Sequence, residues 1–90
     1  MKREELLPRL DYFINHGVWT GSRAFPGKAS VSEEMRYRAL AQDDMLTVCV
    51  WHGPNCFQKA EILSEVQCEL SEEGLDKAFL WLNEQYQKMI

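Results

Sequence analysis

The chain has 90 residues, of which 46% are hydrophobic and 27% are charged, and its net charge at pH 7 is −4. This length predicts one small domain, and the composition is that of an ordinary globular protein. Residues 1–45 carry seven basic and seven acidic side chains, whereas residues 46–90 carry three basic and seven acidic ones. The acidic second half argues against a general nucleic-acid-binding surface.

The N-terminal residues Met-Lys-Arg-Glu-Glu are not followed by a long apolar run. The sequence therefore predicts neither a secretory signal nor a segment that spans a membrane. Three cysteines, an odd number, fit a reducing compartment better than a framework of disulfides. We therefore expect a cytoplasmic protein that is not associated with a membrane.

Residues 4–16 are predicted to form an N-terminal helix. They present one apolar face: Leu6, Leu10, Phe13 and Ile14. Gly17 suits the left-handed position that ends many helices. Pro8 opposes a continuous helix, because proline costs about 3 kcal/mol in a helix interior. The helix then either starts near Leu7 or is replaced by an irregular arm that packs by its apolar side chains.

Residues 17–34 show no sustained period and are interrupted by glycines, a proline and three serines. A connection of this length is usually functional or disordered. We therefore assign residues 1–34 to a helix followed by an irregular segment that could be mobile. Residues 35–90 are assigned to the core of the same single domain.

Three strands are predicted in the core. The first covers Met35 to Ala41, and Asp43-Asp44 follows it as a turn-prone pair. The second covers Met45 to His52; it is apolar on both sides, which is typical of a central strand covered on both faces. Gly53-Pro54-Asn55 predicts another turn. The third strand starts near Phe57 and ends at Leu70, and its apolar side consists of Ile62, Ser64, Val66, Cys68 and Leu70.

A long amphipathic helix is predicted after Ser71, whose hydroxyl suits the N-cap position. Glu72 and Glu73 follow, where negative charge favours the helix dipole. The apolar stripe consists of Leu75, Ala78, Phe79, Leu82, Tyr86 and Met89. The predicted fold is therefore α+β: a three-stranded antiparallel meander packed against a C-terminal α-helix, with an N-terminal helix. The second face of the middle strand then needs cover, either from residues 4–16 or from a second copy of the chain.

Cysteine and histidine residues offer one chemical alternative: Cys49, His52, Cys56 and Cys68. Thiolate and imidazole are the usual ligands of zinc, and His52 with Cys56 could act as a base and a nucleophile. Cys49 and His52 are an odd number of residues apart on a strand, however, so they point to opposite faces. The sequence also supplies no acid to orient the histidine. We expect no cofactor and no catalytic residue, and keep a zinc- or thiol-dependent protein as the alternative.

A second alternative is weak binding of single-stranded nucleic acid by the region from Arg23 to Arg38. Four basic residues lie among three aromatic ones there: Arg23, Lys28, Arg36 and Arg38 with Trp19, Phe25 and Tyr37. Acidic residues at 33, 34, 43 and 44 dilute this charge, and charged residues on an edge strand also prevent unwanted pairing.

Two places could contact a partner. Leu80 falls on the polar side of the C-terminal helix with Trp81 on its flank, and tryptophan is enriched where interfaces are strongest. The turn after the second strand groups Trp51, His52 and Asn55. The sequence thus predicts a small non-enzymatic protein-binding or accessory module, whose partner is another protein or a second copy of the chain. It identifies no small-molecule ligand.

Overall fold

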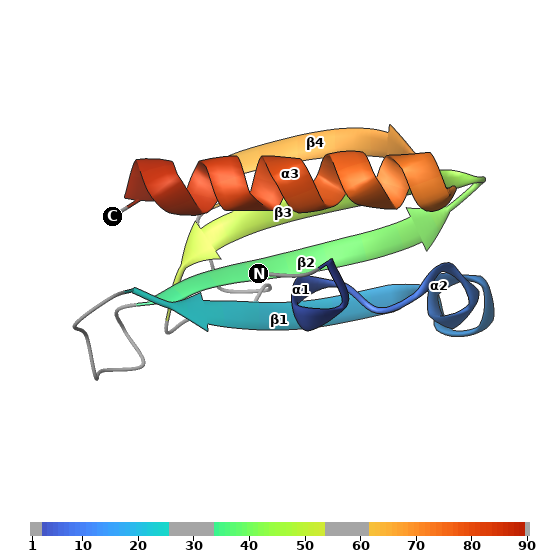
Figure 1. Ribbon diagram of the computed structural model, residues 1–90, viewed down its shortest axis with the longest axis horizontal. Coiled ribbons are helices and arrows are strands. Elements are labelled where there is room, and N and C mark those ends of the chain that lie inside the picture. The colour runs from blue at the N-terminus through green and yellow to red at the C-terminus, as the bar shows by residue number, and fades with distance from the viewer. Residues whose placement is uncertain (1–2, 26–33, 54–61, 90) are drawn as a thin grey trace.

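The computed structural model describes residues 3–25, 34–53 and 62–89. These ranges form three helices and four strands: α1 (Arg3–Leu6), α2 (Leu10–His16), β1 (Val18–Ala24), β2 (Glu34–Gln42), β3 (Met45–His52), β4 (Ser64–Glu69) and α3 (Glu72–Met89). The strands form one antiparallel sheet in the order β1-β2-β3-β4, and α1 and α3 lie over the same face of it (Figure 1). The α+β class is confirmed, but the predicted count of three strands is wrong by one.

The strand that the sequence did not predict is β1, which pairs with β2 along its whole length. By its residue type Gly21 favours an interruption, but it lies in the middle of this strand, beneath the ring of Tyr37. A Cβ atom at Gly21 would lie 2.5 Å from the Tyr37 hydroxyl oxygen, so the glycine makes room for that ring. The prediction of an irregular segment is therefore wrong for residues 18–24, and residues 26–33 lie outside the described ranges.

The N-terminal helix is divided in two at Pro8. Because a proline cannot sit inside a helix without losing a hydrogen bond, α1 ends at Leu6 and α2 starts at Leu10. Gly17 adopts the predicted left-handed conformation, with φ of 81°, and its N–H donates to the Phe13 carbonyl at 3.0 Å. The predicted N-terminal helix is thus present but in two pieces, and α2 starts three residues after the predicted Leu7; the irregular arm is a wrong prediction.

The central hairpin has the predicted boundaries within one residue. Asp43 and Asp44 both have positive φ, 54° and 62°, so they form the tight two-residue turn that matches the twist of a hairpin. The last strand is shorter than predicted: β4 starts at Ser64, and Ile62 precedes it. The part of this prediction from Phe57 to residue 61 lies outside the described ranges.

The corner between β4 and α3 confirms the predicted N-cap. The Ser71 hydroxyl accepts a hydrogen bond from the Gly74 N–H at 3.0 Å. The chain turns so tightly here that a Cβ atom at Gly74 would lie 1.6 Å from the Glu69 carbonyl oxygen. A glycine therefore occupies the position where a capping box would place a glutamate.

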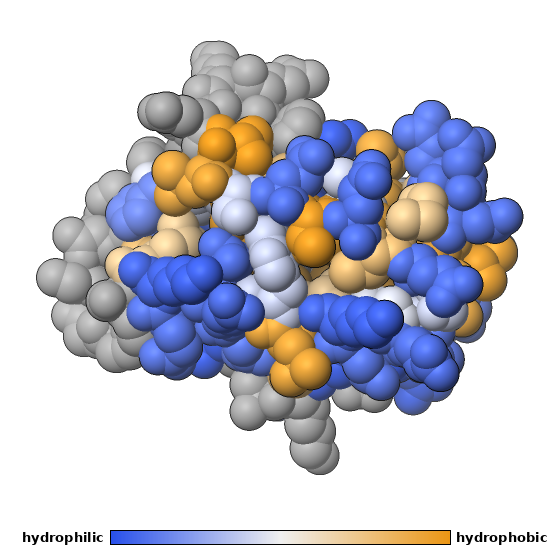
Figure 2. Space-filling model, turned by 90° about the horizontal axis from the view of Figure 1, so that it is seen from above, coloured by the Kyte–Doolittle hydropathy of each residue, from blue (hydrophilic) through white to orange (hydrophobic). Residues whose placement is uncertain are grey.

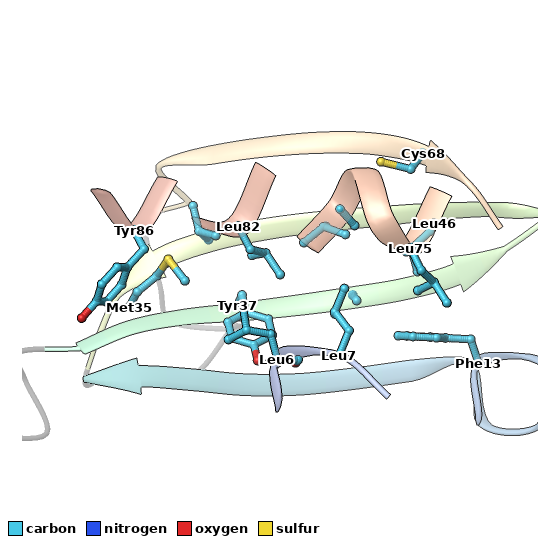
Figure 3. Close-up of a cluster of buried hydrophobic side chains, with 14 of the residues drawn as sticks. Leu6, Leu7, Phe13, Met35, Tyr37, Leu46, Cys68, Leu75, Leu82 and Tyr86 are labelled. Carbon is cyan, nitrogen blue, oxygen red and sulfur yellow. Dashed lines mark hydrogen bonds between the residues drawn. The ribbon is translucent and has the colours of Figure 1, made fainter. Parts of the chain in front are cut away.

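The hydrophobic core lies between one face of the sheet and the helices (Figure 3). The apolar stripe of α3 is confirmed: Leu75, Ala78, Leu82 and Tyr86 are buried, and Phe79 and Met89 are partly buried. The short helices and their link add Leu6, Leu7 and Phe13 to the same core. Among the described residues, no helix combines the length and the apolar character needed to cross a membrane.

The opposite face, which we call the outer face, carries no helix among the described residues. The prediction that residues 4–16 could cover it is wrong, because α1 and α2 pack on the core side. Cys49 and Trp51 lie on the outer face and are buried, yet they do not belong to the core cluster. Their neighbours on adjacent strands are Arg36 and Arg38 of β2 and Glu65 of β4. The described outer face is therefore largely polar rather than a continuous apolar surface.

Candidate functional site

Among the residues that the structure describes, the two edges of the sheet are β1 and β4. Peptide groups in an antiparallel strand alternate between bonding to one neighbour and facing the other side. The Ala41 N–H donates to the Gly17 carbonyl at 2.7 Å, in the register that pairs Val18 with Leu40. Alternate residues from Gly17 onward therefore bond to β2. The peptide groups that face the open side of β1 are those of Val18, Thr20, Ser22 and Ala24.

The side chains of these four residues lie on the outer face, where all four are exposed. None of them is charged, and the two in the centre, Thr20 and Ser22, are small and polar. Natural sheets normally protect an open edge with charged side chains, proline, a bulge or a covering element. The outer-face side chains of β1 supply no charge, and the strand contains no proline. Its open edge, with these four residues, is the candidate site, which we call the β1 edge.

The core side of β1 is held firmly by two anchors. At one end, the Trp19 indole donates to the Leu6 carbonyl at 3.1 Å, and the Tyr37 hydroxyl donates to the same oxygen. At the other end, Arg23 donates to the side-chain oxygen of Asn83 at 2.8 Å, and its guanidinium lies 3.8 Å from the centre of the Tyr86 ring. These contacts tie both ends of β1 to the helical layer.

The β4 edge has a different character. The Leu70 N–H donates to the Asp44 carbonyl at 2.9 Å, in the register that pairs Met45 with Glu69. By the same alternation, the peptide groups that face the open side belong to Glu65, Gln67 and Glu69. Two of these three exposed residues are acidic. Seen from the β4 side, hydrophilic residues cover most of the molecule and separate the hydrophobic ones (Figure 2).

The residues predicted to contact a partner lie in different places. Leu80 is 65% exposed on α3, as predicted, and Trp81 beside it is partly buried against the core. Trp51 is 3% exposed on the outer face. His52 is exposed on the core side, where its ring lies 5.2 Å from that of Phe25. Asn55 lies outside the described ranges, so this set remains a prediction.

The two cysteines that the structure describes cannot bind the same metal ion, because Cys49 lies on the outer face and Cys68 on the core side. The predicted separation of Cys49 and His52 onto opposite faces is confirmed. Burial raises the pKa of both thiols; Glu65 raises that of Cys49 further, and Lys77 partly opposes the rise at Cys68. Both thiols are therefore protonated and weakly nucleophilic at neutral pH. Cys56 lies outside the described ranges.

The residues of the nucleic-acid alternative do not share one surface. Phe25 and Tyr37 are buried in the core. Arg36 lies on the outer face, where it pairs with Glu34 at 2.8 Å, whereas Arg23 is engaged on the core side. Lys28 lies outside the described ranges. Bases could therefore not stack between these aromatic and basic side chains without a rearrangement of the core.

No known family model matches the chain, and comparisons with curated proteins and with solved structures find no match either. Sequence reasoning missed the β1 edge, although one signal for it was present. Val18, Trp19 and Thr20 are β-branched or aromatic residues in a row, which is typical of a strand, although the glycine that follows them is depleted in strands.

Proposed function

We propose that the chain is a small non-enzymatic protein-binding module whose partner adds an extended strand to the β1 edge. The observation that carries this proposal is the pair Thr20 and Ser22, whose peptide groups face away from β2 while their exposed side chains carry no charge. In strand addition, hydrogen bonds between main chains supply the affinity, and alternate side chains supply the specificity.

The anchors on the core side of β1 support this proposal. Trp19 and Arg23 tie the two ends of the strand to α1 and α3. A strand that is already extended loses little conformational freedom when a partner pairs with it, which favours binding. Leu80 and Trp81 remain predicted contacts on α3 for a partner that reaches beyond the edge, and Trp51, His52 and Asn55 remain predictions as well.

The proposal is tested with the tagged chain as bait in extract from its own cells. The variant Thr20→Glu places a negative charge on the β1 edge, opposite Arg38 in the register, so it should leave the fold intact. The matched control is Gln67→Glu, which places the same charge on the outer face of the β4 edge. We expect partners that bind the original chain and the control but not Thr20→Glu.

Each partner found in this way is then purified, and its dissociation constant is measured by titration calorimetry. We expect Thr20→Glu to weaken binding on the order of tenfold or more, which corresponds to about 1.4 kcal/mol. A partner that binds Thr20→Glu as tightly as the original chain, but loses affinity with Gln67→Glu, would contradict the β1 edge as the binding site.

A further inference from the structure

We infer that the strand that completes the β1 edge is β1 of a second copy of the chain, paired antiparallel about a two-fold axis at Gly21. This inference rests on the proposed function and names its partner. A closed two-fold pair is the commonest form of self-association in proteins. It would join the two sheets into one continuous sheet, with the acidic β4 edges at its two ends.

The direction of the peptide groups permits this pairing. Residues that exchange hydrogen bonds across a new antiparallel interface must all come from the set that faces the open side. Around an axis at Gly21, Thr20 lies opposite Ser22 of the second copy, and Val18 lies opposite its Ala24. All four belong to that set. Gly21 is the central residue of the seven in β1, so this register also gives the largest overlap.

The side chains that would meet are complementary on both faces. On the outer face the pairs are Thr20 with Ser22 and Val18 with Ala24, so no like charges stand opposite each other. On the core side, Trp19 would lie beside Arg23 of the second copy. Side chains approach each other most closely at these positions without hydrogen bonds. The Arg23 guanidinium keeps its contacts with Tyr86 and Asn83, and no like charges meet there.

The β4 edge does not suit pairing with a second copy of itself. Its residues with open peptide groups are Glu65, Gln67 and Glu69. The antiparallel pairing that uses all three of these residues places Glu65 opposite Glu69 of the second copy, and it does so twice because of the symmetry. Like charges directly opposite each other destabilise a pair of strands. Of the two open edges, β1 is thus the one whose side chains suit its own copy.

The first test measures molecular mass by sedimentation velocity from about 1 μM to about 1 mM protein. We expect a monomer at the low end and a dimer at the high end, because seven paired residues bury little surface. A mass that stays at one chain throughout would overturn the inference. A mass that grows beyond two chains would also overturn it, since head-to-tail pairing of β1 with β4 does not close.

The second test exchanges charges at the interface. In the double variant Thr20→Glu/Ser22→Glu, each new carboxylate lies opposite one from the second copy, and the same is true of the ammonium groups in Thr20→Lys/Ser22→Lys. We expect each variant alone to dimerise on the order of tenfold more weakly. An equal mixture places Glu opposite Lys and should dimerise at least as well as the original chain. Circular dichroism checks that each variant folds. A mixture no better than its components would overturn the inference.

The third test measures the register in a Cys56→Ser background. Thr20→Cys/Ser22→Cys places thiols at directly opposed positions, about 5.5 Å apart between Cα atoms, which suits a disulfide. In Thr20→Cys alone, the two thiols occupy diagonal positions about 7–8 Å apart, which is too far for a disulfide. We expect covalent dimers from the double variant only; equal cross-linking of the single variant would overturn the register. Buried Cys49 and Cys68 should not react.

These tests separate the two proposals. If the original chain is monomeric throughout, yet an unrelated partner from the extract loses affinity with Thr20→Glu, the second copy is the wrong occupant and the proposed function stands. If the chain dimerises and neither charge pair at Thr20 and Ser22 weakens the dimer, the β1 edge is not the interface, and the inference fails.

Discussion

The two edges of the sheet are built from residues of different chemistry. On the β4 edge, Glu65 and Glu69 place negative charge beside the open peptide groups. On the β1 edge, the corresponding side chains are uncharged and small. β1 therefore has the more apolar exposed side chains of the two edge strands. Its open peptide groups are also less protected from pairing with another strand.

The difference shows which part of this surface could bind a strand. Hydrophobicity alone would point to Ile14, Leu63 or Leu80, which are the most exposed of the large apolar side chains that the structure describes. Ile14 and Leu80 are isolated, and Leu63 adjoins the exposed Ile62. Small exposed apolar groups are ordinary on protein surfaces. A row of open peptide groups whose own residues carry uncharged side chains is less common, because another chain can pair with it.

The largest losses of stability are expected from substitutions of Gly74, which lies beside the end of β4, and of Gly21, which lies within β1. Gly74→Ala would place a Cβ atom 1.6 Å from the Glu69 carbonyl oxygen, and a main-chain atom at a corner cannot move aside easily. We expect a loss of about 3 kcal/mol or more in the free energy of unfolding. Gly21→Ala meets the end of the Tyr37 side chain instead, so it should cost about 1–3 kcal/mol. Urea denaturation measures both, and a greater loss at Gly21 would reverse this comparison.

Single hydrogen bonds on the two sides of the molecule should have similar, smaller effects. Tyr37→Phe removes the buried hydroxyl that donates to the Leu6 carbonyl, but Trp19 still donates to that oxygen, so we expect a loss of about 1 kcal/mol. Ser71→Ala removes the N-cap of α3 and should also cost about 1 kcal/mol. Both losses are read from the shift in the urea midpoint. No measurable loss for Tyr37→Phe would mean that the Tyr37 hydroxyl does not tie β2 to α1.

Alkaline pH should first affect the two buried thiols, Cys68 of β4 and Cys49 of β3, because burial raises the pKa of both. Burial raises the pKa of Cys68 above its ordinary value of 9.0, so the folded state favours the protonated thiol. That preference is fully present below pH 9, and stability declines as pH rises from there through the raised pKa. Burial likewise raises the pKa of Tyr37 above 10.0, so its contribution is lost at higher pH. Cys68→Ala should remove part of the first decline in a pH series of thermal denaturation curves, and an unchanged decline would contradict this assignment.

The smallest effect concerns charge on the edges of the monomer. Thr20→Glu places a carboxylate opposite Arg38 and should stabilise the fold by a few tenths of a kcal/mol. Gln67→Glu adds a third acidic residue to the β4 edge and should destabilise it by a similar amount. Thermal denaturation at low protein concentration and low salt gives both values. If both variants raised the free energy of unfolding, or both lowered it, the two edges would not differ in charge as described.

Much of the core was predictable from local patterns. The alternation in β2 and the helical spacing from Leu75 to Tyr86 each indicated one buried face, and the apolar residues on both sides of β3 indicated a central strand. Ser71 as the N-cap and Gly17 as the left-handed end of α2 were also found where expected. These features depend on the period of the apolar residues and on backbone conformations that few residue types favour.

The candidate site was not predictable in the same way. By its residue type Gly21 indicates a break in regular structure, and only the fold shows that Tyr37 lies against this glycine. Pro8 separates two short helices, and this arrangement depends on the packing of Leu6 and Leu7 in the core. Trp51 and His52 looked like neighbours in a turn, but the strand directs them to opposite faces.

By itself, the sequence determined the α+β class, the central hairpin and the buried face of α3, because each follows from spacing within one short segment. Tertiary structure alone decided that Val18–Ala24 forms a strand, that this strand lies at an edge, and that its open peptide groups carry uncharged side chains. An edge strand differs from a central strand only in whether a second strand pairs with its other side. That second strand comes from residues distant in the chain, so a local pattern does not reveal it.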